Sequence, residues 1–397
     1  MADNNENKVL NVPHLRFPEF TDEWGKYKLS DVCSFFSGGT PSSSKKEYYD
    51  GSIPFIRSGE LHMNKTELFI TEEGLNNSAA KMVEIGDLLL ALYGATSGDI
   101  AIGQIKGAIN QAILCIRTTQ NKKFIESVWK KHVEKLLQTY LQGGQGNLSA
   151  DIVKNISFYF ANSSEQMKLA KFISLLDERI ATQNKIIEKY ESLIQAIIYQ
   201  KKTAGISKGD WQKTELSNVL QERIEKNING HIICSVSVSK GVVNQIEYLG
   251  RSFAAKETLH YNVVKYGDIV YTKSPTGDFP YGIVKRSYIK NDVAVSPLYG
   301  VYMPVNDYIG VILHFYFMQP SNAFNYLHPL IQKGAKNTIN ITNERFLKNS
   351  IPLPKAENEA IYIANTLISI QKKIDIEKKM LRSYEKEKQY LLSKMFI

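Results

Sequence analysis

The sequence predicts two copies of one plan, each a globular domain followed by a long helix, with the two helices paired as an antiparallel coiled coil. Three observations predict this fold. A tryptophan-led motif occurs twice, short motifs follow each tryptophan in the same order, and an apolar heptad pattern closes each copy. Two copies of one module would be related by a pseudo-two-fold axis across the helix pair. The 397 residues are enough for two or three domains with separate cores.

The tryptophan motif opens each copy. WGKYKLSDV begins at Trp24 and WQKTELSNV begins at Trp211, and both follow the skeleton Trp-x-Lys-x-x-Leu-Ser-x-Val. The whole chain has only three tryptophans, and two of them occupy this position. We expect Trp24 and Trp211 to fix the start of each domain by packing against the adjoining helix.

Two further motifs recur in order. Gly-Asp at residues 86–87 precedes an apolar run, as it does at residues 267–268, which predicts a turn into a buried strand in both copies. We expect Asp87 and Asp268 to be structural. Later, the spacing Gln-x-Gly-x-x-Asn begins at Gln142 and again at Gln332. This recurrence favours an old duplication.

The closing segments predict two long helices. Apolar residues alternate in steps of four and three, and one position of the pattern is polar in both copies. One further apolar position of the first copy, Ile194, is replaced by Lys388 in the second, and no proline or glycine occurs within 165–202 or 359–397. The predicted seam residues are Leu169, Ile173, Leu176, Ile180, Gln183, Ile187 and Tyr190, followed by Ile363, Leu367, Ile370, Ile374, Glu377, Leu381 and Tyr384.

These patterns divide the chain into five parts. They are an N-terminal segment (1–23), a first domain (24–160), a central helix (161–205), a second domain (206–355) and a C-terminal helix (356–397). Residues 205–209 and 351–354 are expected to be connecting segments, because they contain glycine and proline.

Composition restricts the class of protein. No apolar run is long enough to span a membrane, and the polar N-terminus lacks the pattern of a secretory signal. Three widely separated cysteines indicate reduced thiols in a cytoplasmic protein. A net charge of +9 favours a polyanionic partner.

The sequence contains no recognisable catalytic motif. It lacks a phosphate-binding Gly-Lys-Ser/Thr loop, a GxGxxG after a strand and a GxSxG elbow, and its seven histidines do not occur at metal-ligand spacing. We therefore expect this chain to have no catalytic residues, to bind no metal and to bind no cofactor.

What remains is a set of residues suited to DNA. Hydroxyl and basic side chains reach phosphates, small residues let the backbone approach a groove, and amides or arginine can pair with base edges. The candidate DNA-binding residues are Ser42, Ser43, Ser44, Lys45, Lys46, Tyr48, Arg57, Tyr93, Gly94, Thr96, Ser97, Gln142, Gln145, Asn147, Arg251, Lys273, Ser274, Thr276, Gln332, Lys333, Lys336 and Asn337.

Several stretches together resemble a known family. They are PHLRFPEF (13–20), SGGTPSSSKKEYYDGSIPFIRSGEL (37–61), TEEGLNNSAAK (71–81), GDLLLALYGATSGD (86–99) and the two duplicated helices. Over nearly its full length the chain resembles the specificity (S) subunit of Type I restriction-modification enzymes. Residues 230–262 depart most and match nothing specific.

The resemblance implies an α+β fold with two mixed α/β target recognition domains separated by the paired helices. Each domain would read one half of a bipartite, asymmetric DNA sequence. The chain would have no active site of its own. It would recruit two modification subunits, which bind S-adenosylmethionine and methylate a flipped adenine, and restriction subunits with nuclease and translocase activity. Residues 94–97 and 142–147 would be DNA-facing in the first domain, and residues 273–278 and 332–337 in the second.

Three other readings stay open on the residues alone. A stand-alone DNA-binding regulator would have the same two-domain plan without enzyme partners. An enzyme with an unrecognised site would transfer methyl groups or cut DNA by itself. A purely structural coiled-coil scaffold would show no salt-dependent affinity for DNA.

Overall fold

The computed structural model describes residues 10–141, 147–252, 254–255, 257–333 and 339–397, and it confirms the predicted α+β class. The chain forms two compact units. Unit 1 comprises residues 1–183 and 380–397, and unit 2 comprises residues 184–379. Each unit therefore holds one globular part together with portions of both long helices. Within the described residues, no helix combines the length and apolar character needed to cross a bilayer.

Unit 1 is built on a four-stranded antiparallel sheet of order β2-β9-β6-β7. Its strands are β2 (Cys33–Ser37), β9 (Ile113–Thr118), β6 (Leu88–Ala91) and β7 (Ile100–Ile102). Helix α3 (Lys122–Leu141) covers one face, where Leu88 and Leu90 share a core with Phe124 and Trp129. A separate antiparallel pair joins β1 (Gly25–Lys28) to β10 (Ser157–Phe160).

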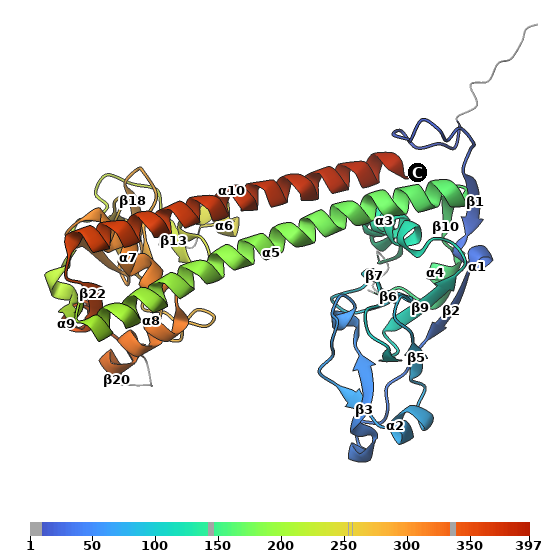
Figure 1. Cartoon of the computed structure of the whole chain (residues 1–397), viewed down its shortest axis with the longest axis horizontal. Helices are drawn as coiled ribbons and strands as arrows, with labels where there is room; N and C mark the ends of the chain where they lie inside the picture. Colours follow the sequence, from blue (N-terminus) through green and yellow to red (C-terminus); the bar gives the residue numbers. More distant parts are fainter. Residues whose placement is uncertain (1–9, 142–146, 253, 256, 334–338) are drawn as a thin grey trace, which may run out of the picture. The chain divides into compact units, whose positions relative to one another are not determined.

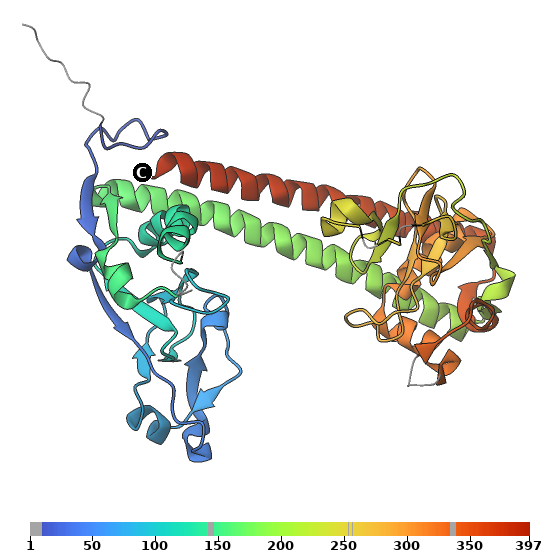
Figure 2. The same ribbon diagram turned by 180° about the vertical axis from the view of Figure 1, so that it is seen from behind.

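A second sheet of unit 1 has the order β4-β3-β8-β5 and lies on the far side of the first sheet from the long helix α5 (Figures 1 and 2). Its strands are β4 (Phe69–Ile70), β3 (Tyr49–Ile56), β8 (Gly107–Ile109) and β5 (Lys81–Val83). The short helices of this unit are α1 (Leu29–Val32), η1 (Lys46–Tyr48), η2 (Ser58–Glu60), α2 (Glu72–Asn76) and α4 (Ala150–Asn155).

Unit 2 repeats this plan. Its four-stranded sheet has the order β12-β19-β16-β17 and carries helix α7 (Asp307–Phe317), and β11 (Trp211–Glu215) pairs with β22 (Ser350–Pro354). The sheet strands are β12 (Leu220–Glu222), β19 (Gly300–Pro304), β16 (Ile269–Tyr271) and β17 (Val284–Arg286). Because both sheets have the same relative strand order, the internal repeat predicted from short motifs is confirmed as a repeated fold.

Smaller elements complete unit 2. The strand pairs are β13 (Cys234–Ser237) with β14 (Gly241–Asn244), β15 (Asn262–Val264) with β18 (Val293–Val295), and β20 (Gln332–Lys333) with β21 (Ile339–Asn340). The helices are η3 (Leu216–Asn218), α6 (Gln245–Leu249), α8 (Pro320–Leu327), η4 (His328–Leu330) and α9 (Asn343–Lys348).

The long helices are α5 (Ser163–Lys208) and α10 (Glu357–Met395). In unit 1 the beginning of α5 packs against the end of α10, since Asp177 forms an ion pair with Lys388 and Arg179 donates to the Tyr384 hydroxyl at 2.9 Å. In unit 2 the end of α5 packs against the beginning of α10. There, Glu191 pairs with Lys378 at 2.7 Å. The two helices therefore run antiparallel.

The predicted seam positions all avoid full exposure. Half of them are buried, namely Leu169, Ile173, Gln183, Ile187, Ile363, Leu367 and Ile374. The others are half-buried, namely Leu176, Ile180, Tyr190, Ile370, Glu377, Leu381 and Tyr384. The heptad pattern thus marks the covered face of each helix.

Trp24 and Trp211 pack against the long helices, as the sequence predicts. The Trp24 indole N–H donates to Glu165 of α5 at 3.1 Å, and the Trp211 indole N–H donates to Glu359 of α10 at 3.2 Å. Both rings are buried. Trp211 also packs closely against Gly205, where an added Cβ would lie 1.9 Å from the ring.

Both predicted connecting segments are wrong. Residues 205–208 continue α5 to its end at Lys208, and residues 351–354 belong to β22. Ile351 and Leu353 point into the core in alternation, which is the period of a strand. The prolines are tolerated because β22 pairs on one side only, in a two-stranded sheet.

Candidate nucleic-acid interface

The same β-hairpin occurs in both units and carries a loop at the same end of the sheet. In unit 1 residues 92–99 join β6 to β7, and in unit 2 residues 272–283 join β16 to β17. We call them the first and second hairpin loops. They contain the predicted residues Tyr93, Gly94, Thr96 and Ser97, and Lys273, Ser274 and Thr276.

A buried aspartate anchors the opposite end of each hairpin. Asp87 accepts from Arg117 at 2.8 Å and from the Glu84 amide, and Asp268 accepts from Arg223 at 2.6 Å and from the Lys265 amide. Burial opposes ionisation of Asp87, but the bonds from Arg117 and from the Glu84 amide, with the charges of Arg117 and Lys122, together outweigh it and lower the pKa of this carboxyl. Both aspartates are therefore structural, as expected.

The first hairpin loop is held tightly at its base. The Gly98 amide donates to Ala91 O, the Ala91 amide donates to Asp99 O, and the Ser97 hydroxyl donates to Leu92 O at 3.0 Å. Gly94 is exposed and has a φ of +84°, which favours glycine. The rigid base and small exposed tip suit a loop that approaches a groove closely.

The second hairpin loop stores backbone strain. Lys273 has a φ of +58°, a conformation that only one other non-glycine residue, Asp50, adopts within the described ranges. Burial lowers the pKa of the Lys273 amine. Beyond it, Ser274 and Thr276 are exposed. A strained residue at a loop entrance is typical of a functional segment.

The Gln-x-Gly-x-x-Asn segments are only partly described. Asn147 is exposed and lies beside the first hairpin loop, because the next residue, Leu148, donates its amide to Leu92 O at 2.8 Å. Gln332 is exposed in β20, and the backbone of Lys333 completes that strand. Outside the described residues lie Gln142, Gln145, Lys336 and Asn337.

The serine-lysine segment belongs to a different surface. Ser42, Ser43, Ser44, Lys45 and Lys46 are exposed, but they precede β3 in the sheet on the far side from α5, apart from the first hairpin loop (Figure 1).

Tyr48 of the same segment is only 4% exposed, so its prediction as a DNA contact is wrong. Its backbone is in close contact with Gly74, where a Cβ would lie 2.5 Å from Tyr48 O, and the Lys45 amine lies over its ring, 4.8 Å from the centroid.

Two predicted arginines differ in their surroundings. The Arg57 guanidinium forms ion pairs with Glu60 at 2.9 Å and Glu67 at 3.0 Å. Two carboxylates therefore compete with any base for this side chain, which weakens the prediction for Arg57. Arg251 is exposed.

His62 lies at the first hairpin loop but is not among the DNA-binding residues predicted from the sequence. Its Nε2 lies 2.9 Å from both carboxylate oxygens of Asp99, at the base of the first hairpin loop. The hydrogen bond with Asp99 raises the pKa of His62 above its usual range. The two residues are 37 positions apart, so no local pattern reveals the pair.

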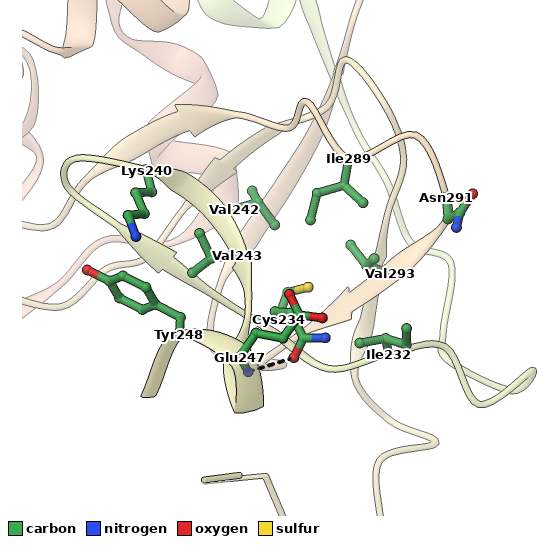
Figure 3. Close-up of a pocket in the computed structure, with 11 residues that line it drawn as sticks. Ile232, Cys234, Lys240, Val242, Val243, Glu247, Tyr248, Ile289, Asn291 and Val293 are labelled. Carbon is green, nitrogen blue, oxygen red and sulfur yellow. Dashed lines mark hydrogen bonds between the residues drawn. The ribbon is translucent and has the colours of Figure 1, made fainter. Parts of the chain in front are cut away.

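Unit 2 also contains a pocket of about 500 Å³ that holds none of the predicted DNA contacts (Figure 3). Its floor is aliphatic and its rim is mostly polar. The floor includes Val242, Ile289 and Val293, with the Cys234 thiol, and the rim includes Ile232, Lys240, Glu247, Tyr248 and Asn291. Burial raises the pKa of Cys234 to about 11, which makes this thiol unreactive at neutral pH.

The chain is similar to restriction-modification proteins in sequence. Residues 21–192 match the family model of the Type I restriction modification DNA specificity domain. The Type I restriction enzyme MjaVIII specificity subunit of Methanocaldococcus jannaschii is 22% identical, over 98% of this chain and 95% of that protein. The EcoR124I/EcoR124II specificity subunit of Escherichia coli is 25% identical, over 41% of this chain and 43% of that protein.

Solved structures share the fold. The S subunit of a Type I restriction-modification system from M. genitalium superposes with a TM-score of 0.59 at 13% identity, covering 97% of this chain and 99% of that one. A chain from a structural study of assembly and conformational transition of the type I system gives a TM-score of 0.52 at 14% identity, covering 94% and 97%.

The duplicated sheets, the antiparallel long helices and these similarities lead to one conclusion. Residues 21–192 match the Type I restriction modification DNA specificity domain, and the chain is similar over nearly its full length, in sequence and in fold, to specificity subunits of Type I restriction-modification systems.

Proposed function

We propose that the chain reads a bipartite, asymmetric DNA target, with one half-site for each unit. The observation that carries this proposal is the repeated hairpin, which places one exposed loop at the same end of the same sheet in both units. Both units have the same sheet and hairpin, but the sequences of the two hairpin loops differ. YGATSG in unit 1 corresponds to KSPTGD in unit 2. A shared framework with different tips favours two half-sites of different sequence.

The proposal extends to partners. The chain recruits two modification subunits, which supply S-adenosylmethionine-dependent methylation of adenine, and restriction subunits, which supply nuclease and translocase activity. S-adenosylmethionine is bound by the modification subunits and not by this chain. The complex works in the cytoplasm, where it has access to DNA.

Mapping methylated adenines tests the proposal. The chain is expressed with its modification subunits in a host without adenine methylation, and the methylated motif is read by single-molecule sequencing. We expect two specified blocks separated by bases that are not read. A contiguous motif, or a palindromic one, would contradict a bipartite asymmetric target. DNA binding without any methylation would favour a stand-alone regulator.

Asn147 provides a second test at the first half-site. Its exposed amide lies beside the first hairpin loop, and losing one bidentate contact to adenine costs roughly 1–3 kcal/mol of discrimination. We expect Asn147→Ala to relax the methylated motif in one block only. The matched control is Asn76→Ala on α2, an exposed asparagine that lies away from the hairpin. Equal relaxation of both blocks would assign Asn147 to folding.

A further inference from the structure

His62 is fixed beside the first hairpin loop but remains accessible. It follows η2, and its carbonyl accepts from the Gln104 side chain at 3.4 Å. Its imidazole faces the Asp99 carboxylate, and 57% of the His62 side chain is exposed. Asp99 ends the loop, with its amide donating to Thr96 O at 2.9 Å. The imidazole therefore stands next to the predicted DNA-facing residues.

The two ring nitrogens of His62 have different roles. Nε2 contacts Asp99, whereas Nδ1 has no hydrogen-bond partner in the part of the chain that the structure describes. When the ring is neutral and Nε2 carries the proton, Nδ1 can only accept a hydrogen bond. When the ring is protonated, Nδ1–H becomes a charged donor. Protonation therefore decides whether the free edge attracts or repels a phosphate.

The neighbouring charges leave His62 able to change its protonation state. Besides Asp99, the charged groups that act on His62 are Glu126 and Lys130 of α3, and these two pair with each other at 2.5 Å. The bond with Asp99 raises the pKa of His62, while burial and Lys130 lower it. Because the folded-state pKa is raised, the charged pair is complete below the ordinary pKa and is lost as the pH rises through the raised value.

Arg57, in the same segment, is less available for a contact with DNA than His62. Its guanidinium is engaged by Glu60 and Glu67, whereas His62 has one carboxylate partner and a free edge. In unit 2, Asp278 occupies the position that matches Asp99, and no histidine forms an ion pair with it among the described residues. The pairing of a histidine with the aspartate that ends the loop is therefore found in unit 1 and not at the matching position of unit 2.

We propose that His62 in its protonated form donates Nδ1–H to a DNA phosphate beside the first hairpin loop, so that DNA binding by unit 1 takes up a proton. This inference rests on the proposed function. It assigns to His62 a positioning contact with the backbone rather than a base contact, since an imidazolium beside a carboxylate matches a phosphate in charge and geometry.

The test measures the affinity of the full-length chain for a short duplex carrying the mapped target from about pH 5.5 to about pH 8.5. We expect the association constant to fall with rising pH by up to about tenfold per pH unit, the limit for one linked proton. His62→Gln should bind weakly with a flat profile. His62→Lys, which stays charged, should bind tightly with a flat profile.

The matched control is His14→Gln, an exposed histidine of the same unit, which should keep the wild-type slope. A flat wild-type profile, or a slope that survives in His62→Gln, would overturn the inference. Salt-dependent binding with a flat profile would leave the proposed function standing. Salt-independent binding, or none, would overturn both.

Discussion

At the scale of single residues, Arg286 of β17 is a buried cation that the fold does not require. Its guanidinium is 1% exposed and lies over the rings of Tyr266 and Tyr288, at 4.7 and 4.5 Å from their centroids. One nitrogen pairs with Asp307, while Nε and Nη1 are buried without a partner among the described atoms. In unit 1 the matching position of the hairpin is Ile102, which shows that an apolar residue can serve there.

We expect Arg286→Met to leave the free energy of unfolding unchanged or to raise it by about 1–4 kcal/mol, the range seen when buried ionic groups are replaced by apolar ones of similar size. Methionine removes two unsatisfied donors and fills most of the same space. The substitution does not leave Asp307 as a buried unpaired charge, because its side chain is 63% exposed to solvent. Denaturant unfolding of the two proteins measures the difference. A loss of several kcal/mol would mean that the tyrosine and Asp307 contacts outweigh the cost of desolvation.

Phe396, just beyond α10, packs deep in the core of unit 1. Its ring is 1% exposed and packs against Trp24 and Phe124, with centroids 6.3 and 5.5 Å away. We expect Phe396→Ala to destabilise unit 1 by about 3–5 kcal/mol, as truncation of a buried phenylalanine usually does. The control is Tyr390→Ala on the same helix, since that ring is 54% exposed. A similar change in both thermal unfolding curves would contradict this role.

At the scale of elements, the two long helices begin in the same way but are anchored differently. Glu165 near the start of α5 accepts from the Trp24 indole and also from Arg16, at 2.8 and 2.7 Å. Glu359 near the start of α10 accepts from the Trp211 indole. Both the Arg16 and Glu165 side chains are well buried, at 12% and 1% exposure. The N-terminal segment therefore adds a buried ion pair to α5.

This asymmetry predicts unequal effects of the same substitution. We expect Glu165→Gln to destabilise the protein by about 3–5 kcal/mol, because it leaves the Arg16 charge buried and unpaired. Glu359→Gln keeps an acceptor for the Trp211 indole and should cost no more than about 1 kcal/mol. Chemical unfolding of both variants provides the comparison. Equal losses would show that the indole bond, and not Arg16, sets the strength of this anchor.

Some helices and strands were predictable from the sequence, and others were not. The helix seams were predictable because their spacing is local, and the buried strands β6 and β16 were predictable because a Gly-Asp turn precedes each apolar run. The strand β22 was missed because its two prolines resemble a linker.

Side-chain partners were harder to predict from the sequence. Arg57 and Glu60 are three residues apart, so their ion pair could have been anticipated. The close approach of Gly74 to the Tyr48 backbone and the contact of His62 with Asp99 depend on pairing between distant segments, which no local pattern reveals.

At the scale of the whole molecule, the repeated plan predicts that one half can replace the other. In unit 1 the beginning of α5 is covered by the end of α10, through Leu392, Met395 and Phe396. A chain that stops at Lys208, the end of α5, lacks this cover and exposes Leu169 and Ile173. The seam of α5 has the same heptad register as that of α10, so α5 from a second copy can occupy the vacated surface.

We therefore expect the chain of residues 1–208 to form a homodimer through antiparallel pairing of two α5 helices. Gln183 lies midway between Leu169 and Ile197, so the two glutamines would meet at the centre and hydrogen bond to each other. Ile194 stands where the seam of α10 has Lys388, which makes the α5 seam more apolar. Closed two-fold pairing is the usual outcome for a self-complementary surface. Sedimentation velocity measures the state, with Ile187→Asp as the variant expected to remain monomeric.

The DNA target of this dimer supplies the more demanding measurement. With modification subunits added, two copies of unit 1 should direct methylation to a palindrome made from the first half-site and its inverted repeat, since both recognition surfaces would be the same. The full chain, mapped in parallel, should methylate its asymmetric motif. A truncated chain that stays monomeric at micromolar concentration would contradict the equivalence of the helices. A dimer whose methylated motif lacks two-fold symmetry would contradict the assignment of one half-site to each unit.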